Sequence, residues 1–98
     1  MHVYFTPRAR ASLARMATRW REKAWVPETF DSDIDEALAR LAASPQTGQI
    51  SRRTTRRTVY RISAPRTKLH LYYVIDELKQ VVIVLQVWSQ LRQGPPRL

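Results

Sequence analysis

The sequence predicts an α+β domain in which a helical hairpin packs on one face of a mainly antiparallel four-stranded sheet. Two stretches in the first half of the chain repeat apolar residues at three- and four-residue spacing. One β-prone stretch begins the chain, and three more, joined by short polar turns, fill its second half. The order strand, helix, helix, strand, strand, strand indicates a single domain over residues 1–98.

The first strand and the two helices are predicted from the residues at their ends. Residues His2–Phe5 are β-prone, and Thr6-Pro7 is typical of an N-cap followed by proline at the first helical position. The connection between the helices contains Trp25, which we expect to cap the core. The second helix carries its acidic residues in its first turns, where they suit the helix dipole, and it should end before Pro45.

The second half is predicted to be a meander of three strands. Residues 46–55 are polar, contain Gly48 and lack apolar periodicity, so we expect a mobile loop there. The predicted strands are Thr58–Ile62, Leu69–Ile75 and Val81–Trp88, with a hairpin turn at residues 76–80. The residues expected to face the helices are Leu69, Leu71, Tyr73, Ile75, Val81, Ile83, Leu85 and Val87. The opposite face of the sheet would then be open to a partner.

The charge distribution favours a polyanionic or acidic partner. The chain has 17 Lys and Arg against 8 Asp and Glu, a net charge of +9. Residues 37–75 contain no acid, whereas five acids lie between Glu28 and Glu36. So lopsided a field suits nucleic acid or an acidic protein, although a solvated surface is the simpler alternative.

Composition argues against several classes of site. Without cysteine there is no disulfide, thiolate nucleophile or zinc–thiolate site. The chain has two glycines and no Gly-rich phosphate loop, and its one internal histidine, His70, is not accompanied by a triad. We therefore expect no metal and no cofactor. No apolar stretch is long enough to span a bilayer and no secretory signal precedes the domain, so we expect a cytoplasmic protein without a membrane partner.

Bases and aromatic residues on the outward sheet face are the candidate functional residues. Those expected on this face are Arg61, Lys68, His70, Tyr72, Gln86 and Trp88, and such a surface suits nucleic acid or an amphipathic peptide. Arg52-Arg53 and Arg56-Arg57 flank Thr54-Thr55, where they would grip phosphate or an acidic patch. For each of them, an ordinary surface or half-buried packing role is the alternative.

Most of the chain resembles the RelE/ParE toxins. The resemblance rests on Val59-Tyr60-Arg61-Ile62, on residues 66–77, and on residues 81–88 with the ending Val87-Trp88-Ser89-Gln90-Leu91-Arg92-Gln93-Gly94-Pro95-Pro96, which is similar to ParE endings. The front half agrees through its F-T-x-x-A start and the Trp-Arg pair late in the first helix. The resemblance implies the toxin component of a type II toxin–antitoxin system.

The resemblance leaves the target open. A ParE-like toxin binds DNA gyrase and needs no catalytic residue, whereas a RelE-like toxin cleaves mRNA on the ribosome. For cleavage, His70 would be the general base, and Arg61 and Arg92 would hold the charged phosphate of the transition state. His70 replaces the usual arginine of its strand, however, and Ser89 and Gln90 stand where basic residues usually sit. We therefore favour the gyrase-binding, non-enzymatic function, and a degenerate module that binds only antitoxin or DNA is the third alternative.

The expected partners follow from these implications. A cognate antitoxin, with an acidic segment that folds on contact, should bind Tyr72 and Trp88 on the uncovered face. Operator DNA would be reached only through the antitoxin. The residues expected to bind the target are Arg52, Arg53, Arg56, Arg57, Arg61, Lys68 and Arg92.

Overall fold

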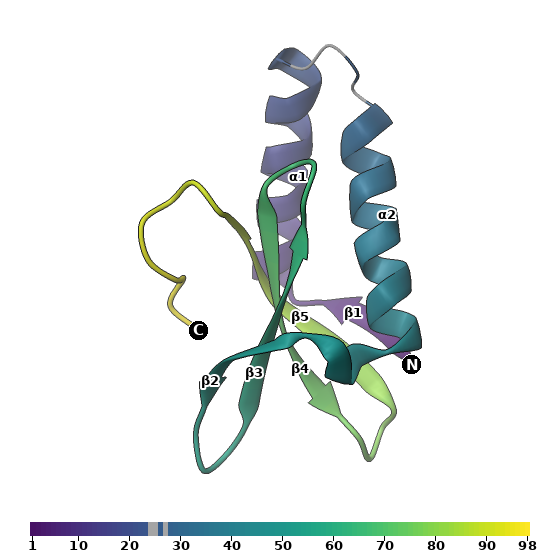
Figure 1. The fold of residues 1–98 in the computed structure, drawn as a ribbon, viewed down its shortest axis with the longest axis vertical. Helices are drawn as coiled ribbons and strands as arrows, with labels where there is room; N and C mark the ends of the chain where they lie inside the picture. Colours follow the sequence, from purple (N-terminus) through teal and green to yellow (C-terminus); the bar gives the residue numbers. More distant parts are fainter. Residues whose placement is uncertain (24–25, 27) are drawn as a thin grey trace.

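The computed structural model describes residues 1–23, 26 and 28–98, so the prediction for Trp25 lies outside the described residues. A helical hairpin stands over one face of a twisted sheet (Figure 1). In chain order the elements are β1 (His2–Phe5), α1 (Pro7–Lys23), α2 (Glu28–Ala43), the short 3-10 helix η1 (Pro45–Thr47), β2 (Gln49–Arg53), β3 (Thr58–Ala64), β4 (Leu69–Asp76) and β5 (Val81–Ser89).

The sheet confirms the predicted α+β architecture and adds one strand. Its order is β1-β5-β4-β3-β2, with β1 parallel to β5 and every other pair antiparallel. The prediction of a mobile loop at residues 46–55 is wrong, because β2 pairs with β3. The pairing runs from Gln49 opposite Arg61 to Arg53 opposite Thr58. Every residue of β2 is exposed, so backbone pairing rather than apolar burial makes this strand, and its sequence carries no apolar alternation.

A close contact at Gly48 fixes the start of β2 against β4. The buried Tyr73 hydroxyl donates a hydrogen bond of 2.6 Å to the Pro45 carbonyl oxygen, and its ring stacks on Tyr60 with centroids 5.5 Å apart. Burial raises the pKa of Tyr73 to about 12. A Cβ atom at Gly48 would overlap the Tyr73 hydroxyl and lie 3.1 Å from the Arg61 carbonyl oxygen.

Replacing Gly48 with alanine should therefore lower the free energy of unfolding by about 1–3 kcal/mol, the usual cost of overpacking. Either the Tyr73 ring or the backbone at the start of β2 must move to make room for the methyl group. Urea denaturation of Gly48→Ala beside Ser51→Ala, an exposed position on the same strand, measures the difference. Equal stability of the two variants would contradict the close contact.

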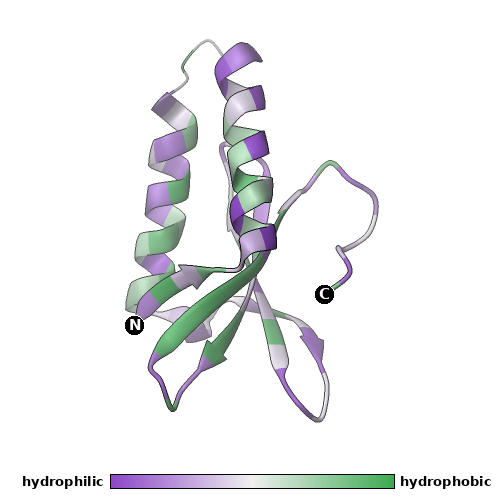
Figure 2. Ribbon diagram, turned by 180° about the vertical axis from the view of Figure 1, so that it is seen from behind, coloured by the Kyte–Doolittle hydropathy of each residue, from purple (hydrophilic) through white to green (hydrophobic). Residues whose placement is uncertain are grey.

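The main core lies between the helices and one face of the sheet. Its buried members are Ala9, Phe30, Ile34, Ala37, Leu41, Ala64, Leu69, Leu71, Tyr73, Val82, Val84 and Val87. The predicted inward face of β4 is confirmed. Figure 2 shows β5 as a mostly hydrophobic strand across the sheet.

The predicted inward face of β5 is wrong over most of the strand. The inward residues are Val82, Val84 and Val87 rather than Val81, Ile83 and Leu85. A β-bulge is the cause, since Tyr72 pairs with Gln86 and Tyr73 with Val84, so that Leu85 is an extra residue. One extra residue reverses the alternation, and an all-apolar run of valines and isoleucine does not reveal it.

The opposite face of the sheet is only partly open, which corrects our expectation. Val59 and Tyr72 are each 2% exposed, yet neither belongs to the helix-side core. Pro96, near the C-terminus, is also buried. The outer face therefore has buried residues of its own, and part of the C-terminal segment is also shielded from solvent.

Three hydrogen bonds hold this C-terminal segment, residues 93–98. The Trp88 indole N–H donates to the Gly94 carbonyl oxygen at 3.1 Å. The Arg8 guanidinium donates to the carbonyl oxygen of Arg97 at 2.7 Å, and that of Arg57 donates to Leu98 at 3.3 Å. The segment therefore turns back from the end of β5 toward the sheet, as Figure 1 shows.

Candidate functional site

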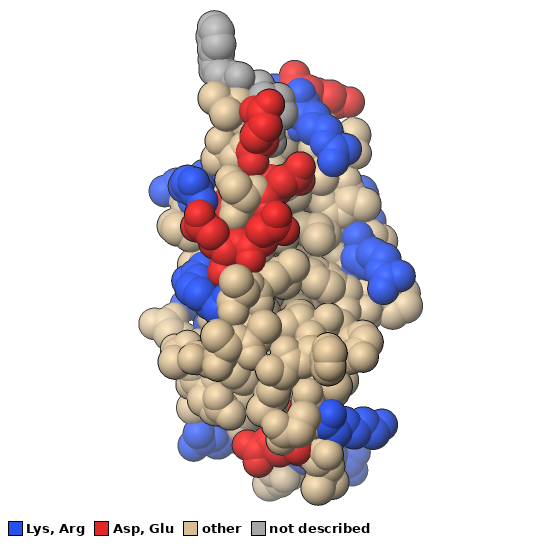
Figure 3. Space-filling view, turned by 90° about the vertical axis from the view of Figure 1, so that its right-hand side faces the viewer, with Lys and Arg blue, Asp and Glu red and all other residues tan. Residues whose placement is uncertain are grey.

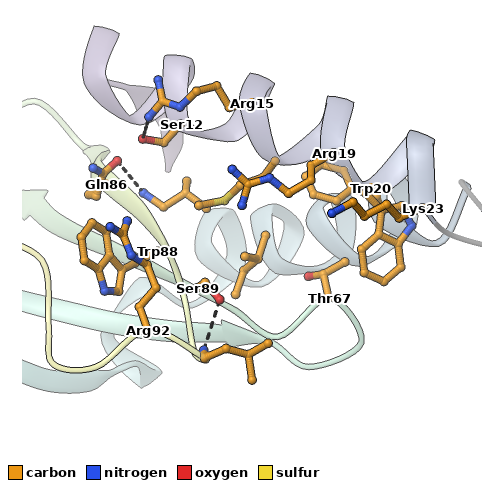
Figure 4. A pocket seen from close by; sticks show the side chains of 15 residues that line it. Ser12, Arg15, Arg19, Trp20, Lys23, Thr67, Gln86, Trp88, Ser89 and Arg92 are labelled. Atoms are coloured by element: carbon orange, nitrogen blue, oxygen red, sulfur yellow. Dashed lines mark hydrogen bonds between the residues drawn. The ribbon is translucent and has the colours of Figure 1, made fainter.

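A groove lined by both apolar and cationic side chains runs between α1 and the end of β5 (Figure 4). Its volume is about 820 Å³. The apolar lining consists of Met16, Trp20, Phe30, Leu69, Val87 and Leu91. The cations around it are Arg15, Arg19, Lys23 and Arg92.

The groove lies beside an edge of β5 that is only partly paired. β1 pairs only with residues 81–84 of β5, so within the described residues the edge of β5 that faces away from β4 has no partner strand at residues 85–89. The backbone N–H of Val87 instead donates to the side-chain oxygen of Gln86 at 3.1 Å. Gln86 is 4% exposed. Two backbone groups in this part of β5 are therefore paired with side chains, the Val87 N–H with Gln86 and the Leu85 carbonyl oxygen with the Thr6 hydroxyl.

Trp88 and Arg92 form one wall of the groove together. The Arg92 guanidinium carbon lies 3.9 Å from the centre of the Trp88 ring, a cation–π contact. Figure 4 shows this stacked pair on one side of the groove and Arg19 and Lys23 extending from α1 on the other. Of the two residues predicted to bind an antitoxin, Trp88 therefore lines a groove, whereas Tyr72 is buried beneath the outer face.

The structure brings Arg61 and His70 together on the outer face. They lie on adjacent strands, where Arg61 pairs with Tyr72 and Ser63 pairs with His70. His70 Nδ1 is 3.1 Å from the Ser63 hydroxyl. Burial, and then the nearby Arg61 charge, lower the pKa of His70 below its usual value. The ring is therefore neutral at pH 7 and has one nitrogen that can accept a proton.

The other two ribonuclease candidates, Arg61 and Arg92, each contact another side chain. The Arg61 guanidinium donates a 2.6 Å hydrogen bond to the Gln49 side-chain oxygen, on β2. The Arg92 guanidinium stacks on Trp88. Both arginines thus have partners within the chain.

The predicted target-binding residues do not form one surface. Arg52, Arg53, Arg56 and Arg57 are all exposed at the β2–β3 turn. Lys68 follows the other end of β3, in a turn where its φ is 59°. The seven-residue β3 puts roughly 20 Å between these two ends. Figure 3 shows most of the acidic side chains on that face gathered over α2.

A buried carboxylate joins α2 to the β3–β4 turn. Asp33 is 1% exposed, and one of its oxygens accepts hydrogen bonds from the Thr67 backbone N–H at 2.8 Å and hydroxyl at 2.7 Å. Arg66 lies 3.5 Å from the other oxygen and 2.8 Å from Glu36, whose hydrogen bond raises the pKa of Arg66. The sequence signal for this cluster is an acid three residues after Phe30, beside the apolar face of the helix.

The described residues contain no group of acids and histidines suited to a metal ion. The helices of the described residues are all too short or too polar to cross a membrane.

One family model matches most of the chain. Residues 3–94 match the family described as ParE toxin of type II toxin–antitoxin system, parDE. The chromosomal ParDE system of P. aeruginosa superposes with a TM-score of 0.68 at 16% identity, covering 91% of this chain and 95% of that one. The search of curated proteins gave no match.

Two further solved structures have the same fold. The RelBE2 toxin–antitoxin complex of Mycobacterium tuberculosis has a TM-score of 0.60 and 23% identity, covering 90% of this chain and 95% of that one. The intact E. coli RelBE complex has a TM-score of 0.61 and 20% identity, with coverage of 93% and 98%. At these identities the structures share a fold, and they do not distinguish a gyrase from a ribosome as the target.

Proposed function

The chain belongs to the ParE toxin family of type II toxin–antitoxin systems, and on this premise we propose that it arrests bacterial growth by binding DNA gyrase. The observation that carries the proposal is the match to the ParE toxin family across residues 3–94. The site supports it, because Arg61 and Arg92 are both engaged within the chain. RNA cleavage needs a base and free cations around the charged transition state, whereas inhibition by binding needs neither.

A cognate antitoxin is the second partner that we propose, and the groove between α1 and β5 is its docking site. An amphipathic acidic segment would place apolar side chains on Met16 and Trp20 and carboxylates beside Arg15 and Arg19. Solved complexes of toxins with this fold contain an antitoxin. Contact of this complex with operator DNA would run through the antitoxin.

Ribosome-dependent mRNA cleavage is the alternative, and one observation favours it. His70 is neutral at pH 7, is hydrogen-bonded to Ser63 and lies close to Arg61. If the toxin cleaves mRNA, His70→Ala should slow cleavage by about 100-fold, the usual contribution of a general base.

We expect His70→Ala to retain full toxicity, because gyrase binding needs no proton acceptor. The measurement is growth after induction of the wild type and the variant at matched protein levels. Ser63→Ala is the matched control, since it removes only the hydrogen-bond partner of His70. Ribosome-dependent cleavage that disappears in His70→Ala would replace gyrase by mRNA as the proposed target.

Induced expression with and without the neighbouring antitoxin gene tests the proposed function. The expected result is relaxed plasmid DNA and double-strand breaks, both prevented by co-expression of the antitoxin. Purified toxin should also inhibit supercoiling by purified gyrase. Normal supercoiling together with mRNA cut at codon boundaries would overturn the proposal.

A further inference from the structure

We propose that the β2–β3 hairpin is a ribbon that binds duplex DNA directly, without the antitoxin. The arginine hairpin is defined as residues 49–58, from the start of β2 to the start of β3. It is an ordered element, although its sequence predicts a loop. Its turn is closed by a 2.9 Å hydrogen bond from the Thr54 N–H to the Arg57 carbonyl oxygen, and the Thr54 hydroxyl accepts the N–H groups of Arg56 and Arg57.

The hairpin presents cations on both of its faces and at its tip. Arg52 pairs with Val59 and shares the outer face, whereas Arg53 pairs with Thr58 and shares the inner face. Arg56 and Arg57 lie in the turn, and all four side chains are exposed. None of the four forms an ion pair with an acidic residue in the part of the chain that the structure describes. The Arg57 contact with Leu98 ties the turn of the hairpin to the C-terminal segment.

Cations on both faces fit a groove with phosphates on both walls better than a flat acidic patch. Paired strands lie about 4.8 Å apart, and the major groove of B-DNA, about 12 Å wide, admits a two-stranded ribbon. Arginine is also the side chain that best matches phosphate geometry. Ser51 and Thr55 add exposed hydroxyl groups that can donate to phosphate oxygens.

The side chains that are missing from the hairpin also favour duplex DNA. Protein interfaces depend on buried aromatic or large apolar anchors, and the single large apolar residue here is Ile50, 49% exposed at the base of the ribbon. Single strands are bound by stacking bases on aromatic rings, and the hairpin has none. Figure 2 shows its tip as hydrophilic.

Direct DNA contact extends the proposed function, since gyrase works on duplex DNA. This inference rests on the proposed function only for the place where the toxin would meet DNA in the cell. DNA binding by the purified toxin is measured without gyrase, so a toxin that inhibits gyrase but ignores DNA would refute this inference alone.

The test is fluorescence anisotropy of a labelled 30-base-pair duplex with purified toxin between 50 and 200 mM KCl. The hairpin variant is R52Q/R53Q/R56Q/R57Q. It should bind about 100-fold more weakly at the lower salt concentration. The slope of log affinity against log salt should become shallower by about 3, since each lost phosphate contact contributes about 0.9.

A matched variant, R10Q/R21Q/K79Q/R97Q, removes the same amount of charge from exposed positions outside the hairpin. We expect it to bind within a few-fold of the wild type, and both variants to melt like the wild type, because surface changes usually alter stability by less than about 0.5 kcal/mol. Equal weakening of the two variants would refute the proposal, as would failure of the wild type to bind duplex at micromolar concentration. Preferential competition by polyglutamate or single-stranded DNA would assign the hairpin to another partner.

Discussion

Replacing Asp33 with alanine should lower the free energy of unfolding by about 3 kcal/mol, a large part of the stability of a small domain. The carboxylate is buried, and one oxygen accepts both the N–H and the hydroxyl of Thr67. Alanine would leave these two donors without a charged acceptor in a buried place, and each unsatisfied group costs about 1–3 kcal/mol. Urea denaturation followed by circular dichroism measures the change.

Two further variants separate the hydrogen bonds from the charge. Asp33→Asn keeps one oxygen for Thr67 and should lose less stability than Asp33→Ala. Asp35→Ala removes an exposed acid from the same helix and should alter stability by less than about 0.5 kcal/mol. Equal losses in Asp33→Ala and Asp35→Ala would show that the buried carboxylate does not hold the β3–β4 turn against α2.

The regular elements of the fold are predictable because each has a local signal. Thr6 is the N-cap of α1, and its hydroxyl accepts the N–H of Ala9 at 3.1 Å. α2 ends at Ala43, where Ser44-Pro45 predicts it. Strand β1 has the predicted bounds, and β3, β4 and β5 begin at the predicted residues and extend one or two residues further.

The features that the sequence did not predict depend on contacts between distant residues. β2 forms because β3 offers it backbone partners, and the bulge at Leu85 leaves no mark in an apolar run. The position of residues 93–98 depends on hydrogen bonds from Arg8 and Arg57, which are remote in sequence. None of these contacts has a periodicity that a single sequence could show.

The same distinction explains the candidate site. The sequence predicts that Arg15 and Arg19 lie on the solvated face of an amphipathic helix. In the structure they line a groove together with Trp88 and Val87 of β5. The strand alternation predicts Tyr72 to be an exposed aromatic residue, whereas in the structure it is buried. The concentration of arginine at residues 52–57 was visible in the sequence, but its arrangement on both sides of a ribbon required the structure.

The groove and the arginine hairpin lie at different ends of the sheet. The groove lies along the end of β5, at residues 86–92, whereas the hairpin is formed by β2 and the start of β3. Strand β4 lies between β5 and β3 in the sheet. A segment bound in the groove would therefore leave the arginines of the hairpin exposed. Variants of the two surfaces should affect antitoxin binding and DNA binding independently, since distant sites usually contribute additively.

Reversing two charges at the groove, with Arg15→Glu and Arg19→Glu together, should weaken antitoxin binding by about 100-fold or more. The two side chains are one helical turn apart on the same wall, so they face the same stretch of a bound segment. Each reversal removes an attraction and adds a repulsion to an acidic partner, and a combined loss of about 3 kcal/mol corresponds to this fold-change.

The matched control reverses Arg10 and Arg21, which lie on the same helix and do not line the groove. It changes the net charge equally, so it should slow association slightly and leave affinity within a few-fold. Titration calorimetry with the antitoxin gives both affinities. In cells, the groove variant should remain toxic when the antitoxin is co-expressed, whereas the control should be neutralised. Equal weakening by the two pairs would mean that the antitoxin responds to the overall field of the toxin and does not dock between α1 and β5.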